Sequence, residues 1–217
     1  MKVVILGTAH LKTTPGKCSP NGLFREYEYS REIVNDIACV LRGYGYMVLI
    51  DYASDEPCEQ MKSITFSGEQ SKELCYRVNY VNTICEEYGI DNVVYVSVHV
   101  NASPPDDGKW HNARGWSVYT SIGETKADKL ASNLAKRAKT NLESVHKHYV
   151  RTDVTDGDDD FENNFYILKN TKCPAVITEN LFMDNREDVT YLVSEVGRHA
   201  IVRLHVEGII DYLNEKV

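Results

Sequence analysis

Residues 93–98 read Val-Val-Tyr-Val-Ser-Val, and this stretch is the most strand-like in the chain. A nearly continuous apolar run is typical of a central strand in a parallel sheet, because helices cover both faces of such a sheet. We therefore expect residues 93–98 to lie in the middle of the sheet, with the other elements arranged around them.

Further short apolar runs are predicted to be strands, at residues 2–6, 47–50, 116–120, 165–168 and 175–177. Apolar residues recur at helical spacing over about 25–43, 67–89, 124–147 and 185–214. Ser67 with Gln70 is expected to cap the second of these helices, and Asn185 the last. Strands that alternate with amphipathic helices predict an α/β fold. The expected architecture is a single α/β domain over residues 1–217, with a mostly parallel central sheet of about six strands and helices on both faces.

Three segments rich in turn residues are predicted to be loops, at residues 8–24, 101–114 and 153–164. The third loop contains the acidic stretch from Asp156 to Asp160, which has a faint similarity to a calcium loop. This stretch lacks the downstream Glu of an EF-hand, so we expect a solvated loop there.

Composition excludes several classes of protein. The chain has 24 Lys and Arg against 32 Asp and Glu, and its net charge of −8 argues against a dedicated nucleic-acid binder. No apolar run approaches the ~20 residues needed to cross a bilayer, so no membrane insertion is expected. From the first residues we expect no signal peptide. Six irregularly spaced cysteines indicate reduced thiols. We expect a protein made in the cytoplasm.

Polar side chains follow three of the predicted strands. His10 follows the first strand, His99 the central one and Glu179 the strand at 175–177. In open α/β sheets, functional groups collect beyond the carboxyl ends of the strands. Together with Glu26, in the first turn of the first helix, two imidazoles and two carboxylates are expected to share one rim of the sheet.

Such a group fits the chemistry of a catalytic zinc site. Two His nitrogens and one carboxylate oxygen form a three-ligand set that leaves the fourth position open for water. The remaining carboxylate can accept the proton of that water and pass it to a leaving amine, as in metal-assisted amide hydrolysis. The spacing does not by itself decide which carboxylate has which role.

Five blocks of sequence, in this order, resemble a known family: Gly7–His10, Thr14–Pro20, Phe24–Glu32, Ser97–Ala102 and Cys173–Asn185. They look like the successive blocks of the zinc-dependent N-acetylmuramoyl-L-alanine amidases of the amidase-3 type. Enzymes of this family cut the amide bond between the lactyl group of muramic acid and L-alanine in peptidoglycan. Because the blocks span nearly the whole chain, the resemblance is more specific than any one of them.

The resemblance implies one Zn²⁺ per chain, with His10, Glu26 and His99 as its ligands. It implies Glu179 as the catalytic carboxylate, and it places Asn101 close to the substrate. Glu28 is the alternative to Glu26 as the acidic ligand. The family usually has Gly at the position of Ala9, a departure that concerns the local backbone rather than the ligand.

The expected activity is zinc-dependent hydrolysis of peptidoglycan or a muropeptide by a monomeric enzyme. The alternatives are a zinc peptidase or carboxypeptidase that acts on another peptide, and a non-catalytic peptidoglycan-binding domain. With no separate wall-binding module expected, the setting would be phage or prophage lysis, internal recycling, or a catalytic domain trimmed of its export signal.

Overall fold

A computed structural model describes residues 1–104, 107–144, 147, 149–155 and 157–215. The strands are β1 (Val3–Thr8), β2 (Met47–Ile50), β3 (Val93–Asn101), β4 (Ser117–Thr120), β5 (Phe161–Glu162) and β6 (Ala175–Phe182). The α-helices are α1 (Glu26–Gly43), α2 (Phe66–Tyr88), α3 (Lys126–Ala138), α4 (Tyr166–Asn170), α5 (Arg186–Leu192) and α6 (Glu195–Glu215). A 3-10 turn, η1 (Ile90–Asn92), precedes β3, and a π-helical turn, η2 (Lys139–Ser144), follows α3.

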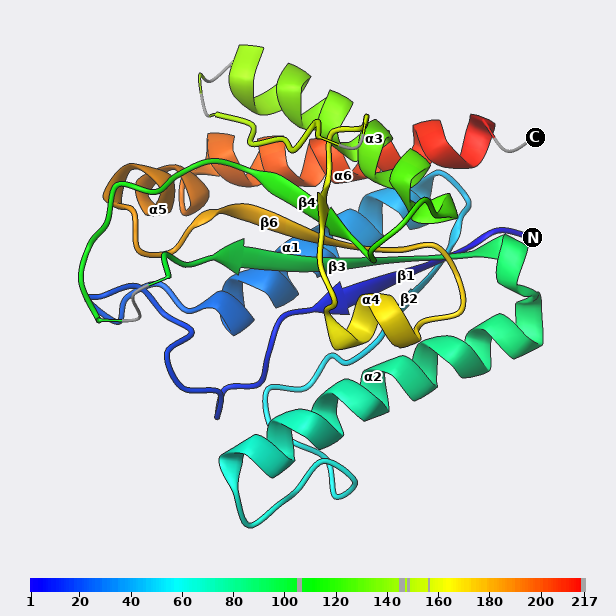
Figure 1. Cartoon of the computed structure of the whole chain (residues 1–217), viewed down its shortest axis with the longest axis horizontal. Helices are drawn as coiled ribbons and strands as arrows, with labels where there is room; N and C mark the ends of the chain where they lie inside the picture. The colour runs from blue at the N-terminus through cyan, green and yellow to red at the C-terminus, as the bar shows by residue number, and fades with distance from the viewer. Residues whose placement is uncertain (105–106, 145–146, 148, 156, 216–217) are drawn as a thin grey trace.

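The strands form one six-stranded sheet in the order β2-β1-β3-β6-β4-β5. Strands β2, β1, β3 and β6 run parallel to one another, whereas β4 is antiparallel to β6 and parallel to β5. The predicted α/β class and mostly parallel sheet are therefore confirmed. The stretch at 93–98 lies in β3, inside the sheet (Figure 1).

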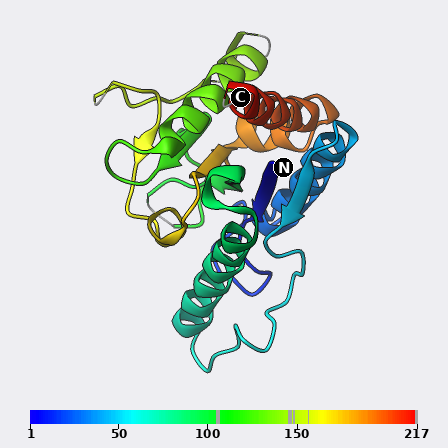
Figure 2. The same cartoon turned by 90° about the vertical axis from the view of Figure 1, so that its right-hand side faces the viewer.

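Helices cover both faces of the sheet, as predicted. Helices α1, α3 and α6 lie on one side and α2 on the other (Figure 2). Val4 and Val96 pack into the core under α1, α3 and α6, whereas Val3 and Tyr95 pack into the core under α2 and α4. Alternate residues of one strand thus enter opposite cores, which explains why both faces of the central strands are apolar.

The prediction of a strand at residues 165–168 was wrong. This segment begins the short helix α4, and the sixth strand is β5, inside the segment predicted to be a polar loop. A run of four apolar residues fits a buried helical turn as well as a strand, because it is too short to show the repeat of either element. A two-residue strand such as β5 is too short to show alternation.

Three helix boundaries also differ from the prediction. Thr65, rather than Ser67, caps α2 by accepting a hydrogen bond from Gly68 N. Asn185 caps α5 as predicted, but the expected long helix is divided into α5 and α6, and Ser194 Oγ accepts from Gly197 N at the start of α6. Helix α3 ends at Ala138, and residues 145–146 of its expected end lie outside the described residues.

Among the described residues, none of the helices combines the length and the apolar character needed to span a membrane.

Candidate functional site

The parallel strands bring the predicted site residues to one edge of the sheet. Strands β1, β3 and β6 point the same way, so their carboxyl ends lie together (Figure 1). His10 follows β1 by two residues, and His99 of β3 is in register with Glu179 of β6. Both strands extend further than predicted, to Asn101 and Phe182, so His99 and Glu179 lie within strands rather than after them.

Glu26 lies between the two histidines. Its Oε2 is 3.4 Å from His10 Nε2, and its Oε1 is 3.1 Å from His99 Nδ1. One ligand atom from each residue lies within 4.8 Å of the other two, close enough for one metal ion to bind all three. The alternative acid, Glu28, is exposed and accepts a hydrogen bond from Tyr27 Oη, so it lies outside this group.

The local backbone places Glu26 at the start of α1. Glu26 N donates to Lys17 O, and Cys18 forms an isolated bridge with Arg25, so the preceding loop is held against the helix. Val100 N donates to Glu26 Oε1 at 3.0 Å. A carboxylate in the first turn is also stabilised by the helix dipole. Glu26 is therefore fixed from its own loop and from β3.

The electrostatics of this group favour an anionic carboxylate beside a neutral imidazole. Burial opposes the ionisation of Glu26, but the charge of His10 and hydrogen bonds from both histidines outweigh burial and hold the pKa of Glu26 below its usual range. Burial lowers the pKa of His99, although Glu26 acts in the opposite direction. These are the protonation states in which both groups bind a metal.

Two residues of α1 that the sequence analysis missed hold the backbone of the site. Ser30 Oγ accepts from Ala9 N at 2.8 Å and donates to Val98 O at 2.6 Å, so it joins the residues that precede His10 and His99. Arg31 donates to Ala9 O and to His10 O, where the backbone is left-handed with φ 47°.

The His99 side of the site has its own supports. Ser97 Oγ lies 3.0 Å from His99 Nε2, which leaves Nδ1 directed toward Glu26. Asn180 Nδ2 donates to His99 O at 2.9 Å, and the indole of the fully buried Trp116 donates to Asn180 Oδ1. Both ring nitrogens and the carbonyl of His99 thus have defined contacts.

Glu179 differs from Glu26 in its surroundings. Its Oε2 is buried and has no hydrogen-bond partner among the described residues. Burial, and after it the charge of Glu26, raises the pKa of Glu179 well above its ordinary value, whereas Lys17 opposes the shift. Glu179, His10 and His99 line a cavity of about 250 Å³ that Lys17 and Tyr166 also border. A carboxyl group that favours its protonated form therefore lies beside the metal-ligand group.

Asn101, expected near the substrate, lies at the end of β3. Its Oδ1 accepts a hydrogen bond from Ala102 N at 2.8 Å, and its backbone carbonyl accepts from Met183 N. The side chain thus shapes the turn that follows β3.

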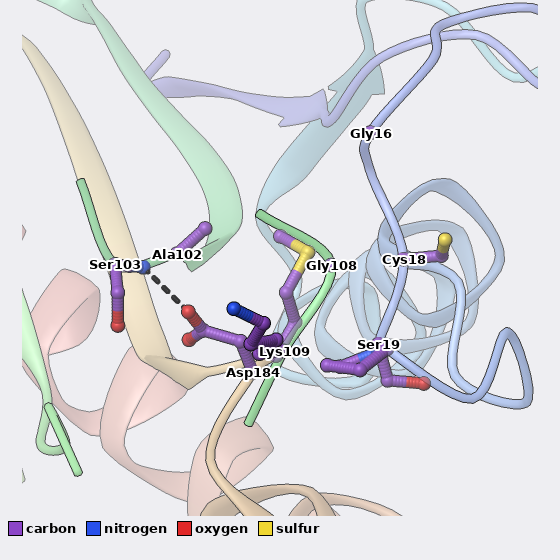
Figure 3. A pocket seen from close by; sticks show the side chains of 10 residues that line it. Gly16, Cys18, Ser19, Ala102, Ser103, Gly108, Lys109 and Asp184 are labelled. Carbon is purple, nitrogen blue, oxygen red and sulfur yellow. Dashed lines mark hydrogen bonds between the residues drawn. The ribbon is translucent and has the colours of Figure 1, made fainter. Parts of the chain in front are cut away.

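A second cavity, of about 160 Å³, lies where the chain leaves β3 and β6. Ser103 N donates to Asp184 Oδ2 on one wall, and Cys18 and Ser19 form the opposite wall (Figure 3). Lys109 also borders this cavity. Since Cys18 is next to Lys17, both cavities border the same loop.

The supporting residues gave little sequence signal. Ser30 and Arg31 lie one turn after Glu26 on a helix, a spacing that places them near the same strand ends. That spacing alone could have suggested Ser30. The contact of Asn180 with His99 O depends on the pairing of β6 with β3, which residue spacing does not reveal.

Comparison with known sequences identifies the family to which the chain belongs. A family model described as N-acetylmuramoyl-L-alanine amidase matches residues 4–211. The chain is 29% identical to the endolysin of Bacillus phage SPP1 over 123 residues, which are 57% of this chain and 41% of that protein. It is 25% identical to the N-acetylmuramoyl-L-alanine amidase CwlM of Bacillus licheniformis over 150 residues, or 68% of this chain and 49% of CwlM. The chain spans half or less of the length of these relatives.

Solved structures share the fold. The CwlD amidase from Clostridioides difficile, solved in complex with the GerS lipoprotein, has a TM-score of 0.79 at 18% identity, covering 99% of this chain and 100% of that one. The catalytic domain of CwlV from Bacillus (Paenibacillus) polymyxa var. colistinus has a TM-score of 0.70 at 19% identity, covering 99% of each chain. At these identities, the likeness shows the fold alone.

Proposed function

The chain belongs to the amidase-3 family of N-acetylmuramoyl-L-alanine amidases, and from that premise we propose that it hydrolyses the amide bond between N-acetylmuramic acid and L-alanine in peptidoglycan. The observation that carries the proposal is the grouping of His10, Glu26 and His99 beside Glu179. A metal-ligand set next to an acid that can transfer protons suits metal-assisted amide hydrolysis.

One zinc ion per chain is proposed to be held by His10, Glu26 and His99. Two imidazoles and one carboxylate match the donor set of catalytic zinc sites. Glu26 Oε2 is buried and makes only a long contact, 3.4 Å to His10 Nε2, among the described residues, which supports the fit because this oxygen can still bind a cation. When bound, zinc supplies a Lewis acid that polarises a carbonyl group and lowers the pKa of water. Ser97, beside the other ring nitrogen of His99, would fix the tautomer of that ligand.

Glu179 is proposed to transfer the proton. As water attacks the carbonyl carbon, a new carbon–oxygen bond forms and Glu179 accepts the proton that the water gives up. As the carbon–nitrogen bond breaks, Glu179 returns this proton to the departing amine of L-alanine. Glu179 must be ionised before it can accept this proton, and the positive charge of a bound zinc ion would favour that ionised form. Burial, which raises the pKa of Glu179, suits a group that must then hold the proton until the amine departs.

The substrate is proposed to lie across both cavities at this edge of the sheet. Lys109 and Asp184 border the cavity of Figure 3 and offer charges of both signs to a peptide stem. Asn101, at the turn beside this cavity, remains a weaker candidate for substrate contact. The similarity to a phage endolysin supports the bacterial cell wall as the place of action, and we propose a monomeric catalytic unit.

The test is digestion of purified peptidoglycan, with new L-alanine amino groups and zinc content measured on the same samples. We expect about one zinc per chain and release that a chelator abolishes. Glu179→Gln should keep zinc and lose activity by about a hundredfold or more, whereas His10→Ala should lose both. Glu28→Gln is the matched control and should keep both, because Glu28 is exposed.

The same products separate the alternatives. New amino groups inside the peptide, with none on L-alanine, would indicate a zinc peptidase. Binding of peptidoglycan without release by the zinc-loaded protein would indicate a non-catalytic binding domain. Equal loss of zinc in Glu179→Gln and His10→Ala would contradict the division of roles between the two residues.

A further inference from the structure

A second group of acidic side chains lies apart from the residues of the proposed active site. Asp128 lies in the first turn of α3, and Asp158 and Asp160 precede β5. One carboxylate oxygen from each residue lies within 4.8 Å of the other two. Two oxygens bound to one calcium ion at about 2.4 Å can be at most about 4.8 Å apart, so these separations fit a single coordination sphere.

The burial of Asp160 is the second observation. The expectation of a solvated loop was wrong at this residue, because Asp160 is only 1% exposed. Thr120 Oγ donates to Asp160 Oδ2, but the buried Oδ1 has no hydrogen-bond partner among the described residues. An unpaired carboxylate oxygen in the interior is costly unless a cation or another donor binds it.

The negative charge of these three carboxylates is not balanced by an ion pair with a basic side chain among the described residues. No Lys, Arg or His of the described residues forms an ion pair with Asp128, Asp158 or Asp160; Lys139 pairs with Asp159 instead, at 2.8 Å. Burial raises the pKa of Asp160 to about 7; the hydrogen bond from Thr120 opposes this shift, whereas Asp158 and Asp128 add to it. The buried Asp160 therefore lies beside two further carboxylates in a place that disfavours its own negative charge.

We propose that Asp128, Asp158 and Asp160 form a calcium site that holds the loop before β5 against the first turn of α3. Hard oxygen donors alone favour calcium over zinc, which prefers nitrogen and sulfur ligands. Calcium also tolerates irregular geometry and completes its shell with water or backbone oxygens, whereas magnesium demands a near-ideal octahedron. The ion would stabilise the edge of the sheet, because β5 is its terminal strand and has only two residues.

The test is titration of calcium chloride into chelator-treated protein, followed by calorimetry, with thermal unfolding as the second readout. We expect saturable binding of about one calcium ion. Calcium at about a hundred times its dissociation constant should raise the Tm by about 5–10 °C. Asp160→Asn should weaken binding by about tenfold or more and abolish the calcium-dependent Tm shift.

Asp153→Asn is the matched control, because it removes the same charge from the segment before β5, and Asp153 accepts hydrogen bonds from Thr155 and is not part of the group. It should bind calcium as the wild-type protein does. The Tm of Asp160→Asn in chelator shows whether the variant is folded, so loss of binding cannot be mistaken for unfolding. The proposal is overturned if the wild-type protein binds no calcium, or if Asp160→Asn binds it with unchanged affinity.

Discussion

Replacement of Ser30 by alanine tests whether α1 positions the histidines. The hydroxyl of Ser30 is wholly buried and joins Ala9 N to Val98 O. Thr8 and Val98 are the last register pair of β1 and β3, so Ser30 continues the connection of the two strands one residue further. Ser30→Ala would remove the partner of the donor Ala9 N and of the acceptor Val98 O.

The expected cost follows from these two groups. Each buried polar group left unpaired costs about 1–3 kcal/mol, so the two together should lower the free energy of unfolding of Ser30→Ala by about 2–6 kcal/mol. Because His10 and His99 directly follow the residues that lose contact, zinc affinity should fall by about 10- to 100-fold, as for other residues that orient metal ligands.

Urea unfolding measures the first effect, and competition for zinc with a chromophoric chelator, well below the Tm of the variant, measures the second. Ser71→Ala is the control, because Ser71 is exposed and its hydroxyl donates to Ser67 O within α2. It should change stability by no more than about 0.5 kcal/mol. If Ser30→Ala matched Ser71→Ala in both measurements, the positioning role of Ser30 would be refuted.

Two further predictions concern the ligand set and an interior histidine. Glu26→Gln should lose most of its bound zinc in elemental analysis, and zinc loss in Glu28→Gln instead would reverse the assignment. His205 of α6 is wholly buried, and burial lowers its pKa to about 4 from 6.5. The unfolded chain therefore takes up this proton first, so the contribution is complete above about pH 6.5 and is lost as the pH falls toward 4. Between pH 7 and pH 5, urea unfolding should show a loss about 2 kcal/mol larger in the wild-type protein than in His205→Gln. The exposed His199→Gln on the same helix should behave as wild type.

The central part of the fold was predictable because its signals are local. The apolar run at 93–98 gives the central strand by itself, and residues beyond the ends of parallel strands must meet at one edge. His10, His99 and Glu179 could therefore be placed together from their positions at the carboxyl ends of the predicted strands. Glu26 joined them through the resemblance of its sequence block to a family, since the helix start did not distinguish it from Glu28.

The remainder depended on contacts between distant residues. Ser30 contacts Val98, which is 68 residues away in the sequence. Nothing in the sequence around a serine on a helix indicates such a distant partner. The burial of Asp160 opposes the usual exposure of aspartate, and it became visible only when the loop packed beside Thr120 and Asp128. At a charged residue that is buried against its general preference, the acidic composition of the segment wrongly predicts exposure to solvent.

The two glutamates of the proposed active site show how one type of side chain can serve two roles. Glu26 is held by Val100 N and by both histidines, and its position on a long helix shared with Ser30 restricts its movement. These contacts favour the anion and suit a permanent ligand. Glu179 Oε2 has no such partner, and burial favours its protonated form. Glu179 therefore holds a proton once it has taken one, and the charge of a bound zinc ion would favour the carboxylate that must first accept it. Exchange of the two roles would require the contacts to be exchanged as well.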